Sequence, residues 1–172
     1  MTTPLILRIR NFLCKLLLTV LIAVTASQVT AADTLAFSFT QEPQQIIIPS
    51  LDLALPVETA EIAYNTWEVS ETTASFGKGS SLPGTIGNSV IFAHARPHLF
   101  GELDQISQGD LIHVFTDYDW FVYEVTELLI VTPENTEVIK KREATELTLF
   151  TCTGINDSHR FVVKAKPLSN QF

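Results

Sequence analysis

Three residues of this 172-residue chain have side chains that together suit nucleophilic acyl transfer: Cys152, His94 and Arg160. Each lies at one end of an apolar segment whose length and composition are typical of a β-strand. A thiol can attack a carbonyl carbon, and an imidazole can accept the thiol proton and later return it to a leaving amine. A guanidinium stays charged and can stabilise the oxyanion formed during the attack. This chemistry requires the three groups to meet in one cleft.

The thiol of Cys152 has two possible roles. The chain has two cysteines, and the other one, Cys14, lies in the N-terminal segment. Cys152 therefore has no partner for an intramolecular disulfide, and it is either a buried apolar residue or a reactive group. An unpaired thiol is a liability in an oxidising compartment, and the loop-forming residues Thr153–Asp157 follow it directly. Both observations favour a reactive thiol.

His94 and Arg160 also have simpler interpretations. A histidine at a strand end is more often a surface or capping residue than a base, and a lone arginine is usually a solvated cation. The apolar residues Ile91–Ala93 would, however, hold the imidazole on a stiff support. A free thiol is mostly protonated at neutral pH, so the imidazole would accept its proton or hold the thiolate as an ion pair.

A zinc site is the remaining alternative for these side chains. It would use His94, His98, Cys152 and His159, but the sequence lacks the paired ligand spacings of structural zinc sites. We therefore expect neither a metal nor another cofactor.

Residues 1–32 differ in kind from the rest of the chain. Arg8, Arg10 and Lys15 precede the apolar run Leu16–Ala26, and small residues follow at Val29–Ala31. This order is that of a secretory signal, and a retained N-terminal membrane anchor is the alternative. Both interpretations predict export, with the N-terminus on the cytoplasmic side.

The charge follows the same division. The chain has 11 basic and 19 acidic residues and a formal net charge of −8. Three of the basic residues and none of the acidic ones precede Ala32, so the remainder has eight basic and 19 acidic residues, a formal charge of −11. A field of this sign repels phosphate backbones, so nucleic acid is not expected as a partner.

The part after the leader is expected to be one all-β domain. Residues 33–45 are polar and without periodicity, which predicts a linker, and residues 46–172 form the domain. Short apolar or alternating segments with turn residues between them are typical of a sandwich or a closed barrel. We expect seven or eight strands and little helix. Strands are predicted at Leu51–Leu55, Thr66–Val69, Ser89–Ala93, Leu111–Phe115, Trp120–Val131, Leu147–Thr151 and Phe161–Ala165.

Other segments are expected to connect these strands. Pro56 should close the first strand, and Glu58–Tyr64 is compatible with a short helix. The glycine- and serine-rich stretch Ser75–Asn88 reads as a loop, and a brief helical turn is expected within Pro97–Ile106. Thr116–Asp119 should form the tight turn of the strongest hairpin.

With these residues in hand, the chain resembles the sortases, which are exported cysteine transpeptidases of the bacterial cell envelope. The likeness extends from Ile48 to Lys166 and rests on four segments in the family's order. The four are Ile48–Val57 as the opening strand, Pro83–His94 leading to the catalytic histidine, Gly109–Ile112 as the following turn and strand, and Thr148–Cys152 with Arg160 after it.

The resemblance implies an eight-stranded β-barrel with Cys152, His94 and Arg160 at one end of a groove. Cys152 would attack a backbone carbonyl in a sorting motif near the C-terminus of a secreted protein. An amine from a cell-wall precursor or a pilin would then resolve the thioester. The segment Thr132–Glu146 would shape the substrate groove. The protein would act outside the cytoplasm, in the cell envelope, either membrane-anchored or secreted.

The resemblance also bears on class and on substrate contacts. The compact domain is similar to the smaller sortase classes, D or E, and no calcium site is carried over. Thr151 and Arg96 are predicted as substrate-binding residues. Two other functions remain open on the sequence: an exported β-barrel binding module with a structural cysteine, and a purely hydrolytic cysteine peptidase.

Overall fold

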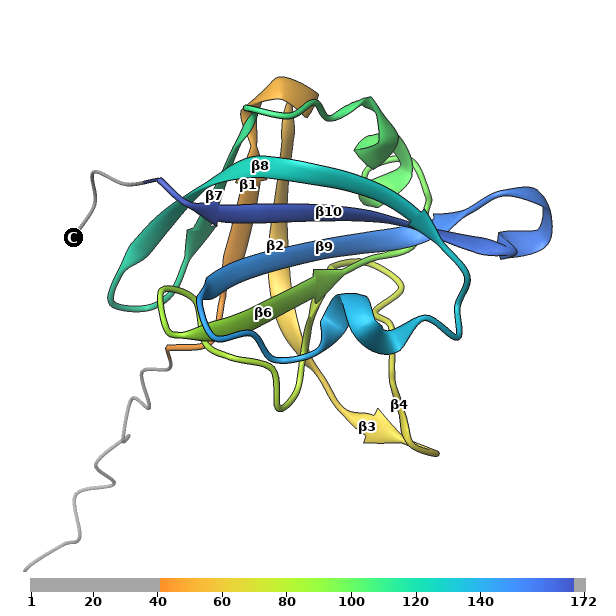
Figure 1. The fold of residues 1–172 in the computed structure, drawn as a ribbon, viewed down its shortest axis with the longest axis horizontal. Helices are drawn as coiled ribbons and strands as arrows, with labels where there is room; N and C mark the ends of the chain where they lie inside the picture. Colours follow the sequence, from red (N-terminus) through yellow and green to blue (C-terminus); the bar gives the residue numbers. More distant parts are fainter. Residues whose placement is uncertain (1–40, 169–172) are drawn as a thin grey trace, which may run out of the picture. The chain divides into compact units, whose positions relative to one another are not determined.

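The computed structural model describes residues 41–168 (Figure 1). The predicted leader, residues 1–32, and residues 33–40 of the predicted linker lie outside the described part, so these predictions stay predictions. Among residues 41–168, no helix has the length and hydrophobicity that crossing a bilayer requires.

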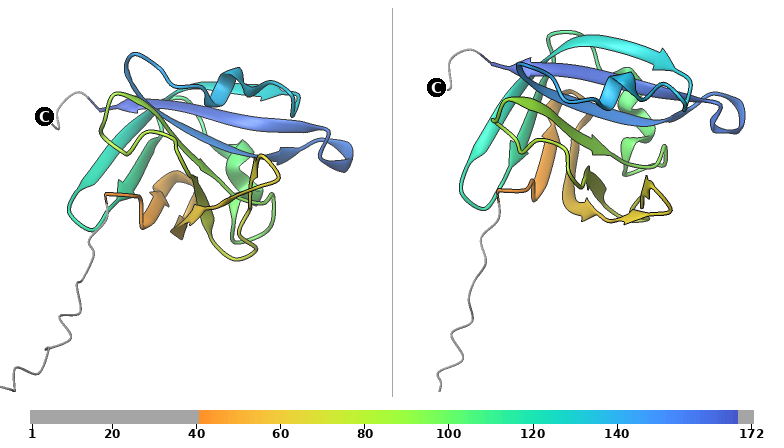
Figure 2. Two further views of the ribbon diagram at one scale, coloured as in Figure 1. Left: turned by 90° about the horizontal axis from the view of Figure 1, so that it is seen from below. Right: turned by 60° about the horizontal axis from the view of Figure 1, so that its bottom comes forward.

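Eight strands close into a barrel in the order β1–β2–β5–β6–β9–β10–β8–β7 (Figures 1 and 2). Two pairings in it are parallel, β2 with β5 and β6 with β9, and the others are antiparallel. The strands are β1 (Gln45–Ile48), β2 (Leu53–Ala60), β5 (Ala74–Gly77), β6 (Gly87–Phe92), β7 (Leu111–Phe115), β8 (Trp120–Val131), β9 (Thr145–Thr153) and β10 (His159–Pro167). The prediction of a closed eight-stranded barrel is confirmed.

The remaining regular structure is short. β3 (Ile62–Ala63) and β4 (Thr66–Trp67) form a separate two-stranded sheet. The helical elements are the 3-10 turns η1 (Pro49–Leu51), η2 (Phe100–Gln105), η3 (Thr136–Ile139) and η4 (Ile155–Asp157). The turn after β9, which contains η4, projects beyond one end of the barrel in Figures 1 and 2.

The barrel interior is apolar because alternate side chains of each strand point inward. Burying one large aliphatic side chain contributes roughly 1.5–3 kcal/mol. A slip of one residue in any pairing would turn these side chains outward, so the core fixes the register. The fully buried side chains of this core include Ile46, Ile48, Ile112, Val114, Leu147, Leu149 and Val163.

A second, smaller apolar cluster lies on the outer face of β6 and β9. It contains Val90 and Phe92 of β6, with Phe150 of β9, Trp67 of β4 and Ile139 of η3 packed against it. All six residues of β6 are consequently buried, as expected for a strand covered on both faces. This outer cluster lies beneath the hairpin and the η3 segment that flank the candidate site.

Two predictions for residues 56–64 are wrong. The segment Glu58–Tyr64 contains no helix, because β2 continues to Ala60 and β3 follows. Pro56 does not close the strand either. It pairs with Gln45, the first residue of β1, and from Val57 onward β2 pairs with β5 instead. Proline is tolerated at such a change of partner, where a continuous ladder is already interrupted.

Other boundaries also differ from the prediction. The expected loop at residues 75–88 contains most of β5 and the start of β6, and β4 ends at Trp67. β9 extends to Thr153, so Cys152 is its penultimate residue and not the residue after it. The predicted strands Leu111–Phe115 and Trp120–Val131 are confirmed at both ends, as is a helical turn after Pro97.

Candidate active site

Cys152 and Arg160 are neighbours across the β9–β10 pair. The register places Arg160 directly opposite Cys152. Directly opposed residues of an antiparallel pair project from the same face, with their Cβ atoms about 4.5–5.5 Å apart. The thiol and the guanidinium therefore leave the sheet on the same side. Both residues are partly exposed, and Cys152 is a free cysteine.

His94 is brought to the same place by the parallel pairing of β6 and β9, which aligns Phe92 with Phe150. The chain stays attached to β9 after β6 ends, because the Ala93 amide donates to the Phe150 carbonyl at 3.4 Å. The Thr151 hydroxyl donates in turn to the Ala93 carbonyl at 2.8 Å. These bonds hold the residue before His94 beside the residue before Cys152.

A groove of about 540 Å³ is lined by His94, Cys152 and Arg160 together. The structure thus brings the three predicted residues to one hollow. One side comes from the β3–β4 hairpin, with Ile62 and Thr66, and the other from the segment between β8 and β9, with Pro133, Thr136 and Ile139.

The floor of the groove is aromatic. Phe92 stacks on Trp67 with ring centroids 5.5 Å apart and on Phe150 with centroids 4.9 Å apart. The Trp67 indole lies so close to Gly77 that a Cβ there would be 2.6 Å from Cζ2. The indole N–H donates to the Lys78 carbonyl at 3.1 Å, which fixes the ring. The groove is therefore apolar along its floor, and Cys152 follows Phe150, at one end of the aromatic stack, by two residues on β9.

Glu71 is a member of the site that the sequence did not reveal. Its Oε1 lies 3.4 Å from His94 Nε2, and its Oε2 pairs with the Arg96 guanidinium. Hydrogen bonding from Arg96 and the positive charge of that group, with a smaller contribution from His94, hold the pKa of the Glu71 carboxyl below its usual 4.5. His94 Nε2 is buried and has no hydrogen-bond partner within residues 41–168. Glu71 lies in a polar segment between β4 and β5 without any motif, so no sequence signal identified it.

The Arg160 guanidinium is held by the loop that precedes it. Nη1 donates to the Asp157 and His159 carbonyls, each at 2.9 Å. Its charge also contributes to lowering the pKa of Glu134, after the hydrogen bonds of that carboxyl to its own backbone and to Thr132. These contacts fix the cation at the start of β10, next to the thiol.

The two predicted substrate-binding residues have intramolecular partners. Thr151 lines the groove but is almost fully buried, and its hydroxyl is bonded to Ala93. Arg96 pairs with Glu71 at the exposed rim. Their roles in binding substrate remain predictions. The histidines of the zinc alternative, His98 and His159, are not among the residues that line this groove.

Comparison with known proteins identifies the family. The model of the sortase domain matches residues 46–168. The chain belongs to the sortase family. The match covers every strand of the barrel except the first residue of β1.

Individual sortases are similar to the chain in sequence and in structure. Sortase A of Bacillus anthracis is 31% identical over 123 residues, which are 69% of this chain and 56% of the relative. A lid mutant of sortase A from Corynebacterium diphtheriae superposes with a TM-score of 0.64 at 30% identity, covering 73% of this chain and 69% of that structure. Sortase C of Streptococcus pneumoniae gives a TM-score of 0.65 at 26% identity, covering 76% and 70%.

These likenesses do not separate the sortase classes, because a class A and a class C structure fit almost equally well. The assignment to class D or E stays a prediction. The chain spans about half the length of the curated relatives it matches.

Proposed function

We propose that this protein is a sortase-type cysteine transpeptidase in which Cys152 is the nucleophile, His94 the general acid and base, and Arg160 the group that stabilises the oxyanion. The observation that carries the proposal is the convergence of these three side chains on one groove with an apolar floor. The buried Nε2 of His94 fits this role, since it makes no hydrogen bond among the described residues and its contact with Glu71 Oε1 is 3.4 Å long. A nitrogen committed to a structural hydrogen bond could not exchange a proton.

The first half-reaction would acylate the enzyme. Cys152 transfers its proton to His94, and the thiolate attacks the carbonyl carbon of a peptide bond lying along the groove. The negative charge that forms on the carbonyl oxygen is stabilised by the Arg160 guanidinium. The C–N bond then breaks, the leaving amine takes the proton from the imidazolium, and a thioester remains on Cys152.

The second half-reaction would release the product. An amine attacks the thioester carbonyl and gives a proton to His94. The C–S bond breaks, and the sulfur regains the proton. One amide bond has been broken and another formed, so the cycle needs neither a redox partner nor a cofactor.

The substrates follow from the family likeness. The acyl donor would be a secreted protein with a sorting signal near its C-terminus, and the amine would come from a cell-wall precursor or a pilin. Pilin substrate specificity is described for the Streptococcus pneumoniae sortase C that this chain resembles. The protein would accordingly act outside the cytoplasm, in the cell envelope, and the predicted leader would direct its export.

The test is incubation of the full chain with a library of C-terminal signal peptides, followed by mass spectrometry of the intact protein. The wild type should accumulate a covalent acyl adduct, and proteolytic digestion of the adduct should locate it on the fragment that contains Cys152. The variant Cys152→Ala should show neither the adduct nor cleaved peptide, whereas Thr153→Ala, on the same strand, should retain both. Turnover by Cys152→Ala would refute the mechanism.

Two further measurements separate the alternative functions. Adding an amine such as triglycine should convert the cleaved product into a ligated one, and cleavage without ligation would identify a hydrolytic peptidase. Iodoacetamide should label Cys152 in the folded protein, because the thiol borders an open groove. Resistance to labelling would favour a binding module with a structural cysteine.

A further inference from the structure

One side of the groove is formed by residues 132–144, which we call the wall segment. Thr136 and Ile139 of this segment line the groove. Its regular structure is the single turn η3, and within it only Val138 and Ile139 are even half-buried. Ile139 packs on the aromatic floor, but one side chain cannot fix a segment of this length. Polar contacts on the side of the segment away from the groove must supply the remaining attachment.

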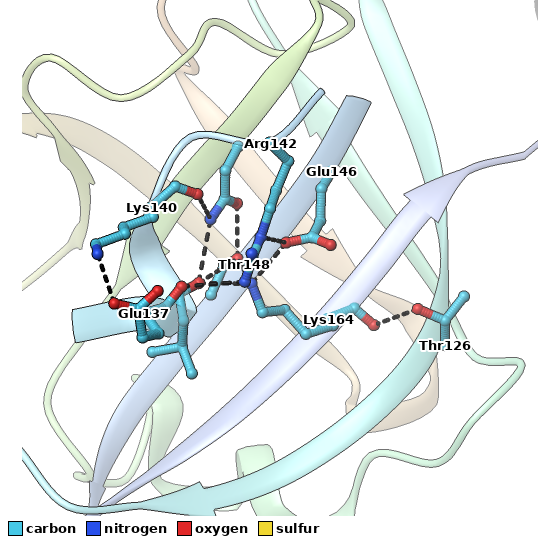
Figure 3. Close-up of polar contacts among 9 residues, drawn as sticks. Thr126, Glu137, Lys140, Arg142, Glu146, Thr148 and Lys164 are labelled. Carbon is cyan, nitrogen blue, oxygen red and sulfur yellow. Dashed lines mark hydrogen bonds and ion pairs between the residues drawn. The ribbon is translucent and has the colours of Figure 1, made fainter. Parts of the chain in front are cut away.

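A buried polar cluster lies behind the wall segment (Figure 3). At its centre Lys164 of β10 is only 4% exposed. Its Nζ donates to the Val138 carbonyl at 2.5 Å, to Glu146 Oε1 at 2.6 Å and to Thr148 Oγ1 at 2.8 Å. An ammonium has three N–H groups, so each one has an acceptor. One of the three bonds reaches the wall segment itself.

Asn88 of β6 adds a second attachment. Its Nδ2 donates to the Val138 carbonyl at 3.1 Å and to the Lys140 carbonyl at 3.2 Å. The Thr148 hydroxyl donates to Asn88 Oδ1 at 2.6 Å, which fixes the orientation of the amide. Lys164, Thr148 and Asn88 thus form one network, and all of its contacts with the wall segment are to backbone carbonyls on either side of Ile139.

The burial of the Lys164 ammonium has a free-energy cost, because removing a charge from water is unfavourable unless the charge is paired and hydrogen-bonded. Burial lowers the pKa of Lys164, and the hydrogen bond and charge of Glu146 oppose this effect. The barrel itself could be completed here by an apolar side chain. What an apolar side chain could not do is bind the Val138 carbonyl.

The sheet register relates this cluster to the candidate catalytic residues. Lys164 lies opposite Thr148, as Arg160 lies opposite Cys152. The two pairs are four residues apart on each strand, so they project from the same face at a separation of about 13 Å. The nucleophile and the buried lysine therefore occupy two ends of one outer face, with the aromatic floor between them.

We propose that Lys164 is a positioning residue that holds the wall segment at a fixed height above the floor and thereby determines which peptide side chains the groove accepts. The proposal rests on the proposed function and adds a specificity determinant to it. Lys164 acts through Val138, and it lines neither the groove nor the adjoining hollow of about 580 Å³ that Thr136 and Ile139 also border.

The variant that tests this removes both charges. Lys164→Met alone would leave the mostly buried Glu146 with only the longer contact to Arg142, 3.8 Å from Nε to Oε1. Lys164→Met with Glu146→Leu instead replaces the closer pair by apolar groups, which proteins often tolerate without loss of stability. Lys166→Met is the matched control, because Lys166 lies on the same strand but is exposed. A melting curve establishes that each variant is folded.

The first measurement is hydrogen–deuterium exchange of the wall segment in the full chain without substrate. The double variant should exchange about tenfold faster than the wild type at residues 136–141, the scale of one lost charge-assisted hydrogen bond. The Lys166→Met control should exchange like the wild type. Unchanged exchange in a folded double variant would overturn the proposal.

The second measurement is cleavage of a positional-scanning library of internally quenched pentapeptides. For the preferred sequences the double variant should show KM raised about tenfold with kcat within about twofold of the wild type, together with reduced discrimination among library members. A loss confined to kcat would refute the positioning role. If the wild type cleaves no peptide, the proposed function fails, and the exchange measurement still decides whether Lys164 holds the wall segment.

Discussion

The hydroxyl of Thr151 provides a sharp test of how His94 is positioned. The bond from Thr151 Oγ1 to the Ala93 carbonyl is 2.8 Å long and is buried. Thr151→Val keeps the shape of the side chain but leaves that carbonyl without its donor. An unsatisfied buried acceptor costs roughly 1–3 kcal/mol. For a domain of this size the melting temperature should fall by about 3–12 °C.

The same change should reduce activity, because Ala93 immediately precedes His94. Displacing a catalytic group by about 1 Å can cost on the order of 10²-fold in rate, so we expect kcat/KM to fall at least tenfold. The fall should be mainly in kcat. If Thr151 instead contacts substrate through its hydroxyl, KM should rise while the melting temperature stays unchanged.

The assay combines differential scanning calorimetry with steady-state cleavage of the best library peptide. Thr153→Val is the matched control, since Thr153 lies two residues further along β9 and is partly exposed. It should melt within about 1 °C of the wild type, as surface substitutions usually do. A Thr151→Val protein that melts like this control would refute the reasoning from the buried hydrogen bond.

Three further outcomes are expected. Arg160→Lys keeps the charge but loses the planar donors, so kcat should fall by about 10²-fold, measured with the same peptide; wild-type kcat would remove Arg160 from the mechanism. Gly77→Ala should displace the Trp67 indole, because the new Cβ would be 2.6 Å from it. The KM for the internally quenched peptide should therefore rise. An unchanged KM would show that the indole does not contact the substrate. Glu71 has a lowered folded pKa, so its contribution to stability is present above pH 4.5 and is lost as the pH falls through the folded pKa. Melting temperatures of the wild type and Glu71→Gln should therefore differ slightly at neutral pH and converge in acid, and a difference that grows in acid would contradict this.

Much of the barrel could be predicted where the determining interactions are local. The β7–β8 hairpin is encoded by apolar runs on both sides of the turn residues Thr116–Asp119, and the boundaries predicted for its strands are confirmed. β5 was missed because it is short and lies among glycines and serines, and its burial comes from pairing with β2 and β6. The helix expected at Glu58–Tyr64 is absent because pairing with β5 overrides the local preference of these residues.

The candidate site divides in the same way. Cys152, His94 and Arg160 could be proposed as site residues because their chemistry is specific and each lies at the end of an apolar run, and their roles stay predictions. The structure places all three on one groove. Glu71 and Lys164 could not be identified, because their contacts join segments far apart in the chain. Glu71 reaches His94 and Arg96 from another loop, and Lys164 of β10 reaches Val138, which lies 26 positions earlier in the chain.

The order of strands in the barrel has a consequence for how reactivity arises. The bond between Thr151 and Ala93 joins residues 58 positions apart in the chain. The parallel pairing of β6 with β9 likewise forms only after the chain between these strands has been synthesised. Pairings between such distant segments make folding slow, since the intervening chain must be ordered first. During synthesis the chain first contains His94 without Cys152. Once Cys152 has been added, the two residues are still apart until β6 pairs with β9. If Cys152 and His94 act as we propose, the pairing of β6 with β9 is also the step that brings thiol and imidazole together, and a chain that has not completed it lacks the reactive pair.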